Sequence, residues 1–261
     1  MYNGWLYSGL KALGSGQKAE FLDSLFNQLY GWTKNVTETY NEFPAGYTEW
    51  TLTGHMNIVS YRGGFLPYSD YPVKITSKQG KEVIKSTARP DLHIHSKDWK
   101  ESCCFELKKD FVSLTTKADL PKHVLPKINE AHGQLKELAG SGEEWAQYGC
   151  STLGLTVWMN WLVGSKDRWE KIWSDSKKYQ EDWEMLFSKF ESSISENSEK
   201  LSSCGRIYYC GYRMSHSLAE KIYQISKKEL KQGNPTDKSS LAIGMLWIFT
   251  MEPWKTLSEK K

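Results

Sequence analysis

The chain has 261 residues, of which 39% are hydrophobic and 25% charged. These proportions are ordinary for a globular protein, and the length suits one large domain over residues 1–261. The net charge is only +3, so bulk charge gives no evidence of nucleic-acid binding. A local basic face would have to supply it.

The five cysteines are odd in number and have no CxxC spacing, which indicates neither a disulfide framework nor a zinc site. The sequence contains no recognisable signal peptide and no membrane-spanning run. We therefore expect a reducing, intracellular location (cytoplasm, nucleoid or nucleus) and no membrane partner.

The N-terminal third of the chain predicts one helix followed by strands. Residues 17–32 carry their apolar side chains on one stripe, as an amphipathic helix does. Residues 35–46 are expected to form a loop, and partial alternation in residues 47–61 predicts one or two strands. Turn residues then lead to a predicted hairpin with strands at 73–75 and 83–84.

The rest of the chain predicts an α/β arrangement. Residues 122–139 form a second amphipathic helix. The two-sided apolar runs at 151–163 and 206–214 are typical of central strands. A helix is expected at 217–231, and the apolar run 241–251 predicts a final buried strand or helix.

Residues 165–203 are predicted to form a helical insertion within the domain, with its serine-rich end, 192–203, as a loop. Its aromatic residues alternate with basic ones, a mixture that can stack bases and contact phosphates. The candidate nucleic-acid contacts, in and outside this segment, are Lys109, Lys166, Arg168 and Lys171. Interspersed acidic residues dilute the charge, so aromatics packed on the sheet beside solvated charges remain the competing interpretation.

Chemistry-bearing residues gather around two predicted strands. Residues 92–95 alternate directly after Asp91, and the alternation of residues 102–108 places Glu106 and Lys108 on one face. The link between these strands is short and polar, which allows an antiparallel turn. Adjacent strands would bring Asp91 close to Glu106 and Lys108.

Two carboxylates beside a lysine suit a hard divalent cation that binds oxygen, such as Mg²⁺. The arrangement resembles the signature of the PD-(D/E)XK nuclease superfamily, which is Pro-Asp, a gap, then Asp/Glu-x-Lys on the next strand. Pro90-Asp91 and Glu106-Leu107-Lys108 carry the resemblance. It extends over roughly residues 17–140, because the predicted order of elements is similar there too.

The resemblance implies a restriction-endonuclease-like α/β core, with a central mixed β-sheet flanked by helices. It makes Asp91, Glu106 and Lys108 the catalytic residues, with Mg²⁺, or Mn²⁺ as a substitute, held by Asp91, Glu106 and the carbonyl of Leu107. The implied activity is metal-dependent hydrolysis of phosphodiester bonds, in DNA in preference to RNA. Cutting both strands of a duplex would suit a homodimer with paired sites.

The accessory candidates are Glu20, Gln134 and His93. Some superfamily members carry an acidic residue on the first helix and a glutamine on the later one, and His93 would line the cleft. Glu20 lies nearly opposite the apolar stripe of its predicted helix, so a solvated glutamate is the competing interpretation. Gln134 also fits an ordinary helix surface.

Two alternatives stay open. Asp/Glu-x-Lys is a common spacing that recurs at 98–100, 175–177, 229–231 and 259–261. In the first alternative, this spacing has no catalytic meaning. Glu106 and Lys108 then form a salt bridge within a hairpin of a catalytically silent nucleic-acid-binding or scaffolding protein. Alternatively, His93 and His95 together with Asp91 would hold Zn²⁺ or Fe²⁺ in a different metal enzyme.

Overall fold

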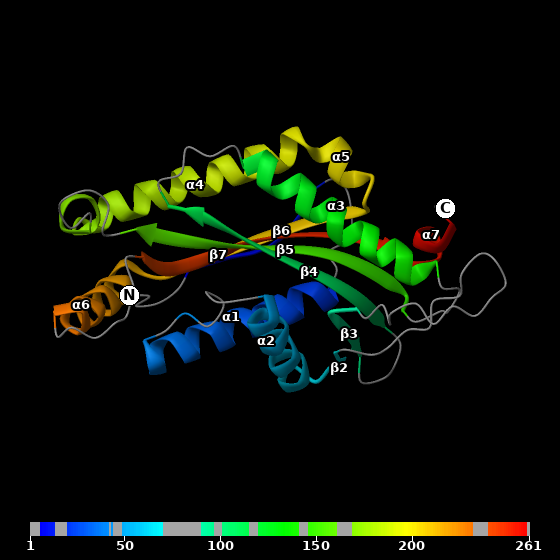
Figure 1. The fold of residues 1–261 in the computed structure, drawn as a ribbon, viewed down its shortest axis with the longest axis horizontal. Helices are drawn as coiled ribbons and strands as arrows, with labels where there is room; N and C mark the ends of the chain where they lie inside the picture. Colours follow the sequence, from blue (N-terminus) through cyan, green and yellow to red (C-terminus); the bar gives the residue numbers. More distant parts are fainter. Residues whose placement is uncertain are drawn as a thin grey trace.

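A seven-stranded mixed sheet forms the middle layer of the computed structural model, in the order β1-β6-β7-β5-β4-β3-β2 (Figure 1). The structure describes residues 6–13, 20–41, 43, 49–69, 90–96, 101–114, 120–140, 146–160, 169–231 and 240–259. The strands are β1 (Leu6–Ala12), β2 (Leu66–Tyr68), β3 (Leu92–His95), β4 (Ser102–Ser113), β5 (Tyr148–Asn160), β6 (Arg206–Arg213) and β7 (Ser240–Pro253).

The centre of the sheet is apolar on both faces. Every residue from Leu241 to Thr250 in β7 is buried, as is nearly all of β5 beside it. β4 runs parallel to β5, whereas the other neighbouring strands pair antiparallel. A parallel pair needs a crossover connection, and α3 (Leu120–Ala139) supplies it by packing on both strands.

Helices cover both faces of the sheet, so the expected α/β class with a flanked mixed sheet is confirmed. On one face lie α1 (Glu20–Tyr40) and α2 (Glu49–Arg62). On the other lie α3, α4 (Ser176–Glu196) and α5 (Ser198–Ser202). The remaining helices are η2 (Trp169–Trp173), α6 (His216–Lys231) and α7 (Trp254–Glu259).

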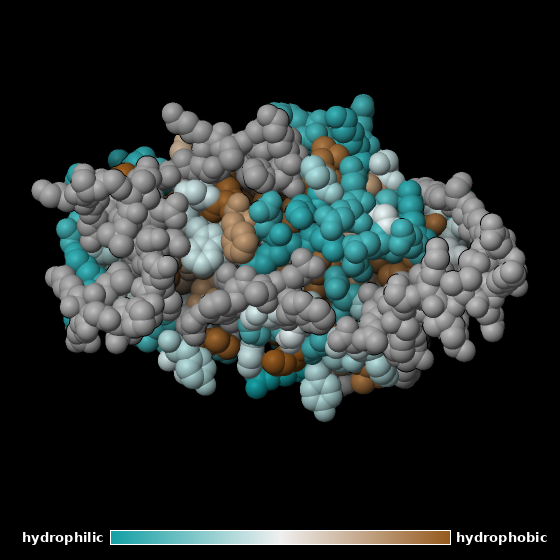
Figure 2. Space-filling model, in the orientation of Figure 1, coloured by the Kyte–Doolittle hydropathy of each residue, from teal (hydrophilic) through white to brown (hydrophobic). Residues whose placement is uncertain are grey.

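Phe26 of α1 shows how this packing works, with its ring centroid 5.3 Å from that of Trp247 and 4.1 Å from that of Phe249. Figure 2 shows hydrophilic side chains gathered over α3 and α5. Within the described ranges, none of the helices is both long and apolar enough to cross a membrane.

The prediction of strands in residues 47–61 is wrong, because the described part of this segment, residues 49–61, lies in helix α2. Its fully buried apolar side chains are Leu52, Met56 and Val59, a spacing of four and three residues that belongs to a helix. Ile58, which seemed to support the alternation, is exposed. A high content of aromatic and β-branched residues disguised the helical period.

Two predicted loops are also partly helical. α1 continues to Tyr40, because Thr33 and Thr37 extend its buried stripe. The serine-rich segment 192–203 belongs to α4 and α5, where Ile194 and Leu201 are buried. In both places small or polar residues hide a continuing apolar period. The predicted hairpin at 73–84 lies outside the described residues.

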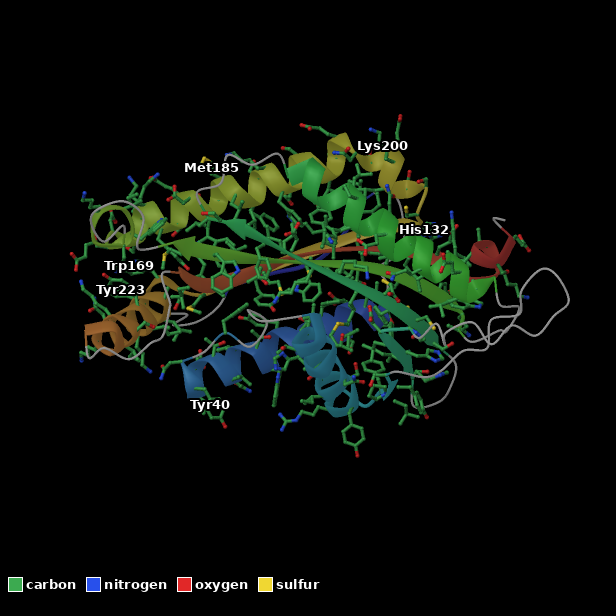
Figure 3. The ribbon with its side chains drawn as sticks, in the orientation of Figure 1. Tyr40, His132, Trp169, Met185, Lys200 and Tyr223 are labelled. Atoms are coloured by element: carbon green, nitrogen blue, oxygen red, sulfur yellow. The ribbon has the colours of Figure 1, made fainter. Side chains whose placement is uncertain are left out.

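The described part of the predicted insertion is helical, and its large aromatics are buried rather than presented to solvent. Trp169 stacks on His216 and Tyr223, with ring centroids 5.3 and 5.2 Å away (Figure 3). The Trp173 indole donates a hydrogen bond of 3.0 Å to Asp182. These contacts favour the packing interpretation of residues 165–203. β1, in a segment where no element was expected, adds the edge strand beside β6.

Replacement of glycine by alanine at two positions tests this architecture, because the expected changes in stability have opposite signs. In α2, a Cβ at Gly54 would meet no atom within 4 Å, so Gly54→Ala gains helix propensity. It should stabilise the fold by roughly 0.5–1 kcal/mol. In β7, a Cβ at Gly244 would lie 2.5 Å from the Trp183 ring and overlap the backbone carbonyl of Tyr212. Gly244→Ala should cost about 1–3 kcal/mol.

Thermal unfolding followed by circular dichroism measures both effects, at roughly 2–4 °C per kcal/mol for a chain of this size. A lower Tm for Gly54→Ala would contradict the helical assignment of α2. An unchanged Tm for Gly244→Ala would contradict the close packing of α4 on β7.

Candidate active site

The β3–β4 hairpin positions the candidate residues. Its antiparallel register pairs Leu92 with Phe105 and His95 with Ser102, as the short polar link predicted. The backbone N–H of Ser96 donates to the Glu101 carbonyl at 2.8 Å and closes the turn. Extending the register by one residue places Asp91 opposite Glu106.

The carboxylate of Asp91 takes a position that a backbone group would hold in a longer ladder. Its Oδ2 accepts a hydrogen bond of 2.7 Å from the backbone N–H of Leu107. The register would put Pro90 opposite Leu107, and proline has no N–H to donate to the Leu107 carbonyl. In a β-strand the N–H and C=O of one residue point to the same side, so this carbonyl points toward Asp91.

Alternation along β4 then sorts its side chains between the two faces of the sheet. Cys104, Glu106 and Lys108 face the α3 layer, where Cys104 packs with apolar side chains of α3 and α7. Phe105 faces the α1 layer, with its ring centroid 6.4 Å from that of Phe21. Directly opposed residues share a face, so the extended register leads us to expect Asp91 on the α3 side with Glu106 and Lys108.

Two buried charges occupy this face. Glu106 is 4% exposed and Lys108 is 7% exposed. The Lys108 Nζ lies 3.7 Å from Oε1 of Glu106 and 3.8 Å from Oε1 of Glu130 on α3. Burying an ion costs several kcal/mol unless it is paired, so these contacts offset part of the cost. Burial, and then the charge of Glu106, raise the pKa of the Cys104 thiol well above its usual range.

The donors at this place fit a magnesium-type cation. Asp91 and Glu106 offer carboxylate oxygens and Leu107 a carbonyl oxygen, which are the hard ligands that Mg²⁺ prefers. Two side chains are enough, since Mg²⁺ keeps several waters. Across the described ranges, no three or more His, Cys, Asp or Glu side chains are grouped to hold a metal ion. A metal cage made of protein side chains alone is thus not seen there.

The accessory candidates fall in different places. Glu20 is exposed at the start of α1, on the face of the sheet opposite Glu106 and Lys108. Gln134 is exposed on α3, one helical turn beyond Glu130 and on the same side of the helix. Only Gln134 therefore lies in the layer that faces the candidate site.

The two strand histidines pack on each other, with their ring centroids 4.2 Å apart. They share the face of Asp91, as the alternation predicted. In the part of the chain that the structure describes, they form no metal-holding group with Asp91. The geometry therefore gives no support to the alternative with Zn²⁺ or Fe²⁺ on His93 and His95.

The predicted nucleic-acid contacts are scattered. Lys109 lies on the α1 side of β4, where its Nζ lies 5.1 Å from the centre of the Phe111 ring. Lys171 is exposed in η2, next to Trp169 and at the far end of the molecule from β3 (Figures 1 and 3). Lys166 and Arg168 lie outside the described residues. The two that are described do not form one basic face with the site.

Glu130 is the residue that sequence reasoning missed. It lies four positions before Gln134 on the same helix, so the argument that singled out Gln134 applied to it equally. Comparison of the chain with protein-family models, with curated proteins and with solved structures found no significant match. The geometry of the site therefore carries the functional argument.

The Asp91 hydrogen bond predicts different stabilities for two substitutions in the absence of metal. Asp91→Ala removes the acceptor and leaves the buried N–H of Leu107 unsatisfied, at a cost of about 1–3 kcal/mol. Asp91→Asn keeps an oxygen acceptor and removes the repulsion between two carboxylates, so the Tm should be unchanged or raised. Thermal unfolding in EDTA measures both. Equal Tm values for the two variants would contradict this role of Asp91.

Proposed function

We propose that this protein is a divalent-metal-dependent nuclease that hydrolyses phosphodiester bonds, in DNA in preference to RNA. One observation carries the proposal. The carboxylate of Asp91 accepts a hydrogen bond from the backbone N–H of Leu107, the residue between Glu106 and Lys108. This bond and the register support a site in which two carboxylates, a carbonyl and an ammonium group lie together.

The surrounding fold supports the proposal. The PD-(D/E)XK resemblance implies a mixed sheet flanked by helices, with the Pro-Asp strand next to the Glu-x-Lys strand. β3 and β4 pair in that way, and α1 and α3 lie on opposite faces of the sheet. The other Asp/Glu-x-Lys site with a fully described structure is Asp175–Lys177, which starts helix α4 with both ends of the triplet exposed.

In the proposed reaction Asp91, Glu106 and the Leu107 carbonyl would hold Mg²⁺. A bound Mg²⁺ supplies acidification of a water ligand and neutralisation of phosphate charge. Lys108 contributes a positive charge on the same face as both carboxylates, where it stabilises negative charge that develops on the phosphate. Its ammonium protons also orient the attacking water.

Glu130 gives Lys108 a second partner. Lys108 lies almost equally far from Glu106 and Glu130, so it keeps a counter-ion when the cation takes over the carboxylate of Glu106. Glu130 is half exposed, which makes this pair weaker than a buried one. In the proposed mechanism Glu130 is a positioning residue that holds Lys108 near the site without touching the phosphate.

The ion pair between Lys108 and Glu106 also favours the second candidate, a scaffolding or nucleic-acid-binding protein with a structural hairpin. The two candidates differ in what removal of Lys108 does. If the ion pair is only structural, removal of Lys108 should lower the stability of the fold and change nothing else. If the protein is a nuclease, removal of Lys108 should abolish most of the cleavage.

Lys108→Ala should leave Mn²⁺ binding in place, because oxygen ligands and not the ammonium hold the cation. Cleavage should fall by roughly 10²–10⁴-fold. Lys108→Arg should restore little, since guanidinium stays protonated and has a different shape. Calorimetric titration with Mn²⁺ measures binding, and a gel time course on plasmid and single-stranded DNA with Mg²⁺ measures cleavage.

Lys177→Ala is the matched control, because this lysine has the same spacing but an exposed helical setting. It should cut at the parent rate, and EDTA should abolish all cutting. A Lys108→Ala protein that cuts as fast as the parent would contradict the nuclease assignment. So would a parent protein that never cuts any of these substrates.

A further inference from the structure

Beside the candidate site, aromatic rings continue along the edge of the sheet. β2 pairs antiparallel with β3, and the register places Tyr68 opposite His93. His93 and His95 lie two and four residues after Asp91, so all these side chains share one face of the sheet. The rings therefore begin next to Asp91 and lead toward the edge strand.

The three rings form one contiguous cluster. The centroid of the Tyr68 ring lies 5.7 Å from that of His95, in an edge-to-face arrangement, and 6.5 Å from that of His93. His93 is buried and supports the other two, whereas Tyr68 is 40% exposed. Burial lowers the pKa of His95, which favours its uncharged ring. The exposed part of the cluster is thus an aromatic surface that packing holds in place.

Tyr68 also lines a hollow of about 500 Å³ between α2 and β2. The hollow is bordered by Tyr61 and Arg62, both exposed, and by Pro67. The guanidinium of Arg62 lies 4.5 Å from the centre of the Trp32 ring of α1, so Arg62 belongs to the α1 side of the sheet, opposite the candidate site. The feature beside the site is therefore the exposed Tyr68 ring, and it matches the chemistry of single-stranded nucleic acid, whose bases stack on aromatic rings.

We propose that Tyr68, with His95 beneath it, binds the nucleotides of a single strand that leads into the candidate site. The inference deepens the proposed function and rests on it for the position of the cleaved bond. In a duplex, the bases stack on each other and their faces are not open to a side chain. An exposed ring next to the site therefore selects a single strand or a frayed end.

Binding without cleavage tests the proposal, by fluorescence anisotropy in EDTA with a labelled single-stranded DNA of about 12 nucleotides and its duplex. Tyr68→Ala should weaken binding of the single strand by roughly 5- to 100-fold, while duplex binding changes little. Tyr68→Trp should bind the single strand at least as well as the parent. Circular dichroism verifies that each variant is folded.

Tyr40→Ala is the matched control, because Tyr40 is 71% exposed at the end of α1, away from β2 (Figure 3). It should bind as the parent does. Equal affinities of Tyr68→Ala and the parent for the single strand would overturn the proposal, as would equal losses for both DNA forms. A parent that binds single strands through Tyr68 but never cuts would contradict the nuclease assignment and leave the binding surface supported.

Discussion

One hydrogen bond organises the candidate site, from the backbone N–H of Leu107 to the carboxylate of Asp91. It joins residues 16 positions apart in the sequence, at the point where the β3–β4 ladder ends. Because the Asp91 side chain accepts this bond, the β3–β4 ladder can end at Leu92 while the backbone N–H of Leu107 keeps a hydrogen-bond acceptor. The register puts Asp91 opposite Glu106, and strand geometry points the Leu107 carbonyl to the same side as its N–H.

The rest of the fold makes this arrangement costly. The sheet is covered on both faces, so a charged residue on β4 has to be paired or has to bind something. β4 nevertheless buries Glu106 and Lys108 on the side where α3 packs. Places where a sequence breaks the ordinary rule of an apolar interior are frequently functional. The ion pair of Lys108 with Glu130 compensates part of this cost. In the proposed function a cation bound by the neighbouring oxygen atoms compensates the rest.

Sequence patterns were sufficient where periodicity was strong. The alternation around Glu106 and the polar link after His95 predicted adjacent antiparallel strands, and the structure has them. Patterns failed where composition and period disagreed, as in α2, whose aromatic and β-branched residues suggested strands. The argument that singled out Gln134 could have included Glu130, but only the packing of α3 on β4 shows that Glu130 is the residue next to Lys108. Tyr68 could not be found in this way, because its importance depends on the register of β2 on β3.

A crystal structure grown with Mn²⁺ and measured at a wavelength where manganese scatters anomalously tests the central claim most directly. The account predicts an anomalous peak bound by the carboxylates of Asp91 and Glu106 and by the Leu107 carbonyl, at oxygen distances of roughly 2.0–2.6 Å. Lys108 should remain beside it, within reach of Glu130. An occupied manganese site elsewhere in the molecule, with none between Asp91 and Glu106, would contradict the account.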